Sequence, residues 1–113
     1  MLGRGNLETR TMILPDQPPP TPGTGDVWRE VIDAHGPAYP DLVPLMEERR
    51  LLGIQRYGQP LQRGDSRSHA VDAQQEAADL AAYCTSEGWD DLARTALDMW
   101  REVRRRADRG VTP

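Results

Sequence analysis

Apolar side chains recur at intervals of three and four residues in four stretches of the chain, which is the spacing of one face of an α-helix. The stretches cover residues 26–36, 41–58, about 68–86 and about 89–108. No stretch shows the strict alternation of apolar and polar residues that is typical of a half-buried strand. The pattern therefore predicts an all-α fold, a bundle of about four helices, three of them long and one short.

Helix-capping and helix-breaking residues mark the edges of these stretches. Asp26 and Asp41 are candidate N-caps of the first two helices, and Gly36 and Gly58 follow their last turns. The sequence EGW, which begins at residue 87, ends the third helix. The expected apolar stripe of the fourth helix comprises Leu92, Ala96, Met99, Trp100 and Val103.

The composition changes at both ends of the helical region. Residues 1–25 end in PDQPPPTPGTG, and such a run cannot form a helix interior, so we expect a flexible Pro-rich N-terminal arm. Residues 26–109 form the predicted helical domain, and residues 110–113 form a C-terminal tail. With 113 residues, the chain has the size of one domain.

Composition limits the class of protein. Charged residues make up 28% and hydrophobic ones 37%, which suits a polar protein with a modest core. Aromatic residues make up 5%, fewer than a β-sandwich or barrel usually needs. The net charge of −4 does not favour nucleic-acid binding. An Arg-rich cluster at 101–109 leaves a small DNA-binding regulator as a weaker alternative to interaction with the helix dipole.

The single cysteine, Cys84, excludes an intrachain disulfide and a Cys-rich metal site, and we expect it to be a small core residue. No apolar run has the length of a signal-peptide core or a membrane span. We therefore expect a cytoplasmic protein without a membrane partner.

The third helix carries acidic residues where its composition suggests burial. In AVDAQQEAADLAAY, residues 70–83, the residues Asp72, Glu76 and Asp79 fall within an arc of roughly 60°. Small apolar residues border this arc on both sides, so the carboxylates repel one another beside apolar surface. Arg partners, protonation or a divalent cation would each offset that repulsion.

The second helix also presents acidic residues near its apolar side. Glu47 lies within roughly 40° of Val43, Leu51 and Ile54, and Glu48 lies close to the same side. Two neighbouring helices with inward carboxylates predict a site for Mg²⁺ or Mn²⁺, which prefer oxygen ligands. Pairing with some of the 14 Arg residues is the alternative.

The segments EERRLLGIQRYGQPLQ and SRSHAVDAQQEAADLAAY together resemble the MazG-like all-α nucleoside triphosphate pyrophosphohydrolases, especially the small phage-type, dATP/dGTP diphosphohydrolase-like members. The likeness covers residues 41–86, under half of the chain. Its matching positions are Arg49, Gly53, Tyr57, Gly58, Leu61, Arg67, Asp72, Ala73, Gln75, Glu76 and Asp79.

The resemblance implies Mg²⁺- or Mn²⁺-dependent hydrolysis of a (d)NTP to (d)NMP and pyrophosphate, and a homo-oligomer, a dimer or tetramer, that completes the bundle. It implies metal ligands at Glu76 and Asp79, which match a Glu-x-x-Asp motif, and at Glu47 and Glu48. Leu51 replaces the third acid of the family's first motif, and Asp72 lies where it would supply additional charge. A phage-encoded member would act in the host cytoplasm.

Further site assignments follow from these ligands. Glu47, Glu76 and Asp72 are the candidate catalytic residues, with Asp72 as a ligand or as a base that orients water. Arg56 and Arg67 are candidate phosphate-binding residues, and Tyr57 either stacks on a base or anchors its turn. The alternative function is a non-catalytic helical module that assembles with itself or with a partner and uses its carboxylates in Arg pairs.

Overall fold

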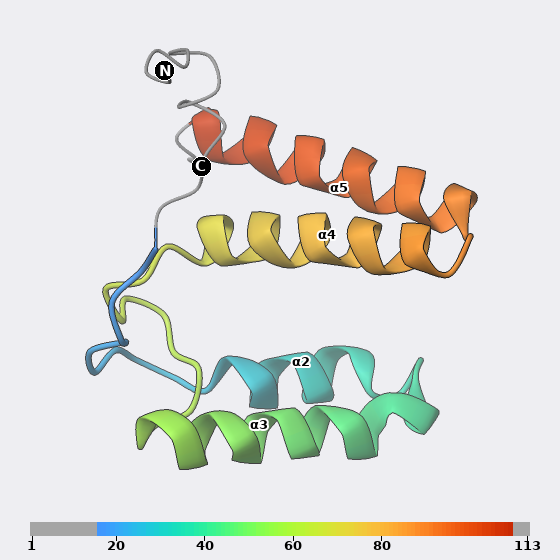
Figure 1. The fold of residues 1–113 in the computed structure, drawn as a ribbon. Helices are drawn as coiled ribbons and strands as arrows, with labels where there is room; N and C mark the ends of the chain where they lie inside the picture. The colour runs from blue at the N-terminus through green and yellow to red at the C-terminus, as the bar shows by residue number, and fades with distance from the viewer. Residues whose placement is uncertain (1–15, 110–113) are drawn as a thin grey trace. The chain divides into compact units, whose positions relative to one another are not determined.

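The computed structural model of the chain describes residues 16–109. Within them lie the α-helices α2 (Val27–His35), α3 (Val43–Tyr57), α4 (His69–Ser86) and α5 (Asp90–Asp108), and the 3₁₀ turn η1 (Pro40–Leu42) (Figure 1). The only extended pairing in this part of the chain is an isolated bridge between Thr24 and Arg63. The prediction of an all-α fold is therefore confirmed.

The described residues fall into two compact units. Residues 17–67 form the first, in which α2 and α3 lie side by side, and the residues from 68 onwards form the second, in which α4 and α5 lie side by side (Figure 1). None of the described helices is long and apolar enough to cross a membrane.

In the first unit, the helix ends are set largely by the residues that the sequence suggested. Asp26 caps α2, because its Oδ1 accepts a hydrogen bond of 3.1 Å from the backbone N–H of Arg29. Gly58 ends α3 in the left-handed conformation, with φ of 76°. Asp41 does not cap α3: it lies inside η1, and Leu42 occupies the N-cap position without a side-chain bond.

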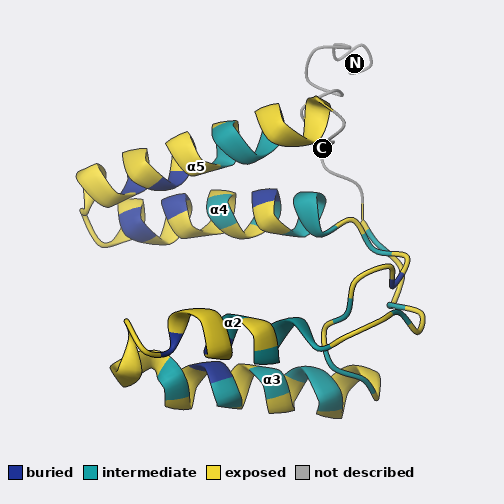
Figure 2. Ribbon diagram, turned by 180° about the vertical axis from the view of Figure 1, so that it is seen from behind, coloured by how far each residue is buried: buried dark blue, intermediate teal, exposed yellow. Residues whose placement is uncertain are grey.

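The second unit is built on small side chains. Ala81 and Cys84 of α4 and Ala93 and Ala96 of α5 are buried, and the buried positions lie on the sides of the two helices that face each other (Figure 2). Side chains of this size let two helices approach closely. The burial of Cys84 confirms its prediction as a small core residue.

The expected stripe of α5 is only partly buried. Ala96 is buried and Trp100 and Val103 are half-buried, whereas Leu92 and Met99 are exposed. The buried side of α5 includes Ala93 in place of Leu92. The side that faces α4 is therefore rotated by about one residue, roughly 100°, from the predicted stripe at this end of the helix.

The segment before α2 is hydrogen-bonded to the loop before α4. Thr24 and Arg63 exchange two backbone hydrogen bonds, of 2.9 and 3.0 Å, and the N–H of Thr21 donates to the carbonyl of Asp65 at 2.8 Å. The expected flexible arm thus includes residues that are bonded to another part of the chain, a connection that the sequence pattern did not suggest. The rest of that arm, residues 1–15, and the predicted tail, residues 110–113, lie outside the described residues.

Candidate functional site

The carboxylates of α4 lie on the part of that helix that α5 leaves open. Ser68 caps α4, since its Oγ accepts a hydrogen bond of 3.2 Å from the N–H of Val71. Counting along the helix from this end places Asp79 roughly 160° and Glu76 roughly 140° from the buried Ala81. Both acidic residues are exposed.

Glu76 and Asp79 make no hydrogen bond or ion pair with another residue that the structure describes. Asp72, one turn before Glu76, is half-buried and has polar interactions of its own. Two apolar side chains flank the exposed pair, with Leu80 48% and Tyr83 69% exposed. The expected stripe of acidic residues is therefore present, but its exposed members carry no desolvation cost of the kind that the sequence suggested.

Glu47 has a different environment. The Arg29 guanidinium donates from Nη1 to Oε2 and from Nη2 to Oε1, both at 3.0 Å, which is the bidentate geometry of a strong Arg–carboxylate pair. This carboxylate raises the pKa of Arg29 above its ordinary value, chiefly through the hydrogen bonds. For Glu47 the structure thus contains the Arg pairing that was the alternative to a cation, and this carboxylate binds a metal only if it leaves Arg29.

A second ion pair joins the same two helices. Arg50 donates from Nε to Oδ2 of Asp26 at 2.8 Å. The hydrogen bond from Arg50, together with that from the Arg29 backbone, holds the pKa of the Asp26 carboxyl below its ordinary value. Glu48, in contrast, is exposed and has no such partner among the described residues. On α3, Glu48 is therefore a more accessible carboxylate for a cation than Glu47.

The candidate substrate-binding residues form two separate sets of contacts. The Arg56 guanidinium carbon lies 5.3 Å from the centre of the Tyr57 ring, and both residues are exposed at the end of α3. Arg67 lies in the loop that leads into α4, where its Nη1 donates to the carbonyl of Pro18 at 2.8 Å.

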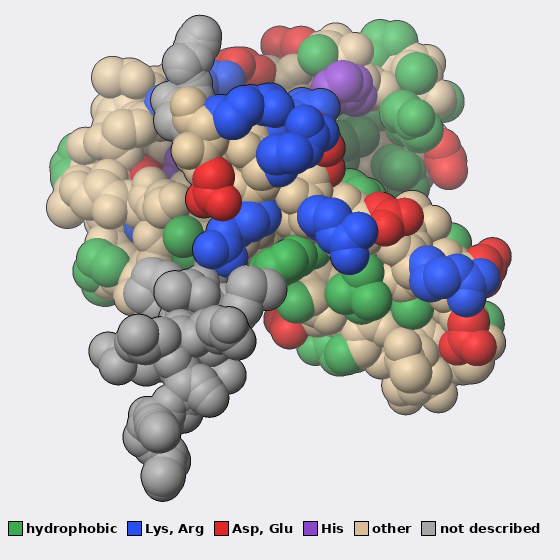
Figure 3. Space-filling view, turned by 90° about the horizontal axis from the view of Figure 1, so that it is seen from above, with side chains coloured by type: hydrophobic (Ala, Val, Ile, Leu, Met, Phe, Trp, Pro, Cys, Tyr) green, Lys and Arg blue, Asp and Glu red, His purple; other side chains and the backbone are tan. Residues whose placement is uncertain are grey.

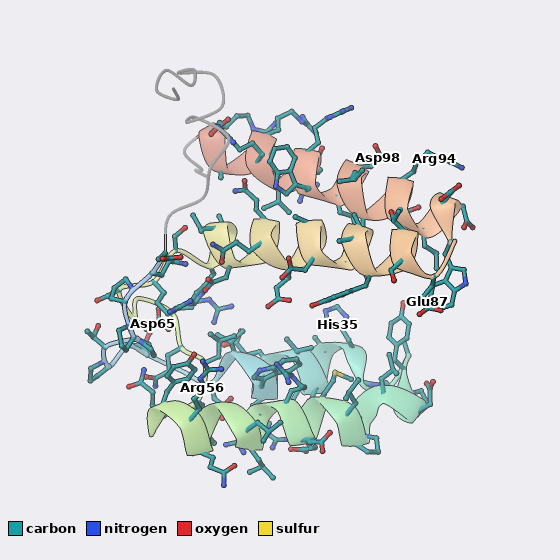
Figure 4. The ribbon with its side chains drawn as sticks, in the orientation of Figure 1. His35, Arg56, Asp65, Glu87, Arg94 and Asp98 are labelled. Atoms are coloured by element: carbon teal, nitrogen blue, oxygen red, sulfur yellow. The ribbon has the colours of Figure 1, made fainter. Side chains whose placement is uncertain are left out.

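Asp65 is a residue that the sequence reasoning missed. It is 1% exposed, and its Oδ1 accepts a hydrogen bond of 3.2 Å from the N–H of Arg67, two residues further on (Figure 4). This is the geometry of an Asx-turn. An Asp beside Gly64 in a loop rich in turn-forming residues was the signal that would have suggested it.

The predicted metal ligands are divided between the two units. Among residues 16–109, no three Asp, Glu, His or Cys side chains are gathered closely enough to hold one ion. The oxygen donors of Glu76 and Asp79 suit Mg²⁺ or Mn²⁺ chemically, because these ions take one or two carboxylates and complete their shell with water and phosphate. The α4 pair therefore fits such an ion as a partial ligand set, and Glu47 in its pair with Arg29 does not.

The basic end of α5 is partly neutralised within its own helix. Arg105 and Arg106 both donate to Glu102, the latter at 2.7 Å, and these bonds lower the pKa of Glu102 to about 2. Arg104 pairs with Asp108 one turn further on, at 3.3 Å. Figure 3 shows Arg, acidic and hydrophobic side chains interspersed on the face that it displays. This arrangement agrees with the reading of the cluster as a helix-end feature.

Comparisons of the chain with protein-family models, with curated proteins and with solved structures gave no match.

Proposed function

We propose that the protein is a Mg²⁺- or Mn²⁺-dependent hydrolase that converts a (d)NTP to the (d)NMP and pyrophosphate, with purine deoxynucleotides as the substrates to test first. One observation supports this most directly: α4 carries Glu76 and Asp79 unpaired on its open face, at the spacing of the Glu-x-x-Asp motif that the sequence resembles. Unpaired carboxylates three residues apart on a helix can share one cation.

The residues take distinct roles in this proposal. Glu76 and Asp79 hold the metal, and Asp72 orients the attacking water. Glu48 on α3 is a further carboxylate ligand, and Glu47 joins the ligand set only after it leaves Arg29. The bound metal would neutralise phosphate charge and polarise the reacting phosphoryl group. Arg67 and Arg56 hold the phosphate groups by charge-assisted hydrogen bonds, and Tyr57 offers its exposed ring to a base.

Assembly into a homo-oligomer, a dimer or tetramer, belongs to the same proposal. Large apolar side chains are exposed on α3 and on α4, among them Leu45 at 51%, Leu52 at 45% and Tyr83 at 69%. A pair of helices with so few buried side chains is a small core for a stable domain. A second copy that covers these side chains would bury apolar surface and bring further carboxylates towards α4.

Pyrophosphate release from dATP, dGTP and the other (d)NTPs in Mg²⁺ buffer tests the activity. We expect Glu76→Gln to lower the rate on the order of 100-fold, because the amide keeps the shape and loses the charge that holds the metal. Glu87→Gln is the matched control, since Glu87 is an exposed acidic residue at the far end of α4 (Figure 4). Full activity of Glu76→Gln would refute the site.

The bidentate pair between Arg29 and Glu47 favours the second candidate, a non-catalytic helical module that uses its carboxylates in Arg pairs. Thermal melts with and without Mn²⁺ separate the two. A cation site predicts stabilisation of about 2.7 kcal/mol when Mn²⁺ is 100 times its dissociation constant, and Glu76→Gln should abolish the gain. Equal melting temperatures with and without the metal would instead support the module.

A further inference from the structure

Several hydrogen bonds join the segment 18–25 to the loop 59–67, although about 40 residues of sequence separate them. Beyond the Thr24–Arg63 and Thr21–Asp65 backbone bonds, the N–H of Val27 donates to the carbonyl of Leu61 at 2.8 Å. We call residues 18–25 the strap. It runs beside the loop that ends directly at the N-cap of α4.

Two glutamines of the loop bind the strap backbone. The Gln62 side chain accepts a hydrogen bond from the N–H of Gly23 and donates one to the carbonyl of Gly25, both at 3.0 Å. Gln59 donates to the carbonyl of Thr21 at 2.9 Å. The loop thus satisfies backbone groups of the strap that would otherwise need water.

Gly23 is where the strap backbone comes closest to the backbone of the loop. A Cβ atom at this position would lie 2.1 Å from the carbonyl oxygen of Arg63, a backbone atom that cannot swing aside as a side chain can. No residue other than glycine fits here while the strap and loop keep their hydrogen bonds.

The loop has a conformation that needs outside support. Gly64 has φ of 67°, and Ser66, a residue with a side chain, has φ of 72°. A non-glycine residue in the left-handed region persists only where its surroundings hold it there. The strap does so, since Thr21 bonds the backbone of Asp65 and its Oγ1 lies 2.5 Å from Oγ of Ser66.

Arg67 is the last residue of the loop that the strap holds. Its guanidinium is held by the carbonyl of Pro18 in the strap, and its backbone N–H by the buried Asp65 carboxylate. The next residue, Ser68, begins α4, the helix that carries Glu76 and Asp79. The strap therefore fixes both the backbone and the side chain of the Arg that directly precedes that helix.

We propose that the strap locks the 59–67 loop, and that Gly23 is thereby a positioning residue for Arg67 in the binding of a phosphate-containing anion. The second half of this proposal rests on the phosphate-binding role given to Arg67 in the proposed function. The first half stands on the hydrogen bonds and the close approach alone.

Limited trypsin digestion of the full chain tests the lock, because Arg63 and Arg67 are themselves trypsin sites in the loop. We expect Gly23→Ala to speed cleavage after these two residues roughly tenfold or more, since proteolysis follows the population of the open loop. Thr24→Ala is the matched control: its backbone bonds with Arg63 remain, and its exposed side chain makes no bond to the loop. Gln62→Met is a milder variant that removes both side-chain bonds without a clash.

Loop cleavage in Gly23→Ala and Gln62→Met at the rate of Thr24→Ala would overturn the lock. Circular dichroism of each variant distinguishes an opened loop from a lost fold. If Gly23→Ala loses its helical signal, Gln62→Met decides the question.

Calorimetric binding of inorganic pyrophosphate in Mg²⁺ buffer tests the positioning. We expect Arg67→Gln and Gly23→Ala each to weaken binding about tenfold, and the double variant to bind no more weakly than either, because both changes remove the same interaction. A purely structural role for Gly23 would instead give independent effects that multiply in the double variant.

Multiplying effects, wild-type affinity in Arg67→Gln, or no pyrophosphate binding by the wild type would each overturn the positioning role. A chain that binds pyrophosphate in this strap-dependent way but releases none from any (d)NTP would refute the proposed hydrolysis and leave the strap inference standing.

Discussion

The two helical units use their charged residues in opposite ways. Between α2 and α3, acidic residues meet Arg across the helix pair, as Arg29 meets Glu47 and Arg50 meets Asp26. Between α4 and α5, small buried side chains such as Ala81 and Ala96 make the contact. Glu76 and Asp79, on the open face of α4, make no hydrogen bond or ion pair with the described residues and are therefore not needed to hold their own unit together.

The sequence of α4 explains this difference. No Arg occurs between Arg67 and Arg94, so Glu76 and Asp79 have no Arg at the helical spacing of three or four that pairs Glu102 with Arg106 in α5. Two exposed carboxylates without a paired Arg, such as Glu76 and Asp79, repel each other and are suited to binding an external cation. Whether an acidic residue pairs with an Arg therefore decides its role. A paired carboxylate stabilises the fold, and an unpaired one is a candidate metal ligand.

The largest expected effect comes from the small-residue contact. Ala96→Leu adds volume at a position that is 1% exposed, and we expect it to lower the free energy of unfolding by about 1–3 kcal/mol. Ala82→Leu, at an exposed position of α4, should change it by less than about 0.5 kcal/mol. Urea unfolding of both variants measures the difference, and equal stabilities would show that the contact tolerates larger side chains.

In the first unit, we expect the largest loss of stability from substitutions of Asp26. Asp26→Ala removes the cap of α2 and the partner of Arg50, so we expect it to lower the free energy of unfolding by about 1–2 kcal/mol. Asp26→Asn keeps a capping oxygen and removes only the charge, so it should lower the free energy of unfolding less than Asp26→Ala does.

The effect of the Asp26 charge should also depend on pH in a defined direction. Because the pKa of Asp26 is lowered in the folded protein, the charge contributes its full stability above the ordinary value of 3.8. That contribution is lost as the pH falls through the lowered pKa. Melting curves of the wild type and Asp26→Asn should therefore converge in acid, and a gap that widened there would contradict the pairing.

A smaller effect is expected for the pair between Arg29 and Glu47, whose side chains are 42% and 39% exposed. A double-mutant cycle with Arg29→Met and Glu47→Gln should give a coupling free energy of about 0.2–1 kcal/mol, since water screens the pair. A coupling near zero would mean that Glu47 is as available to a cation as Glu76 is.

The smallest effect on stability is expected at Glu102, on the solvent side of α5. Its carboxylate should titrate with a pKa of about 2 in an NMR experiment, because Arg105 and Arg106 hold the charged form. The pairs support folding at pH above the ordinary value of 4.5, and this support is lost as the pH falls through about 2. Replacing both Arg residues by Gln should return the pKa towards 4.5. Unchanged titration would show that the pairs do not form in solution.

Local signals in the sequence were enough to predict the helices. The 3.6-residue periodicity, with Asp26 before α2 and Gly58 after α3, placed the ends within about two residues. Asp41 failed as a cap because Pro40 begins a 3₁₀ turn that contains it. Met99 was misplaced because a helical wheel gives the side of a residue but not the position of the neighbouring helix.

Long-range partners could not be predicted from local pattern. Arg29 lies 18 residues before Glu47, so an examination of α3 alone could not reveal the pair. The strap contributes mainly backbone atoms to its bonds with the loop, and the loop side chains that bind them, those of Gln59, Gln62 and Arg67, give no local sign of a partner about 40 residues away. The acidic stripe of α4 was found because it lies within one helix. Its exposure became clear only once α5 was placed on the other side.

The burial of Cys84 gives the protein a built-in reporter. It is the chain's only cysteine, and it lies 4% exposed where α4 faces α5. A thiol reagent can reach it only when the two helices separate. The rate of thiol modification therefore measures how often α4 and α5 separate. The measurement needs no substitution and no introduced label.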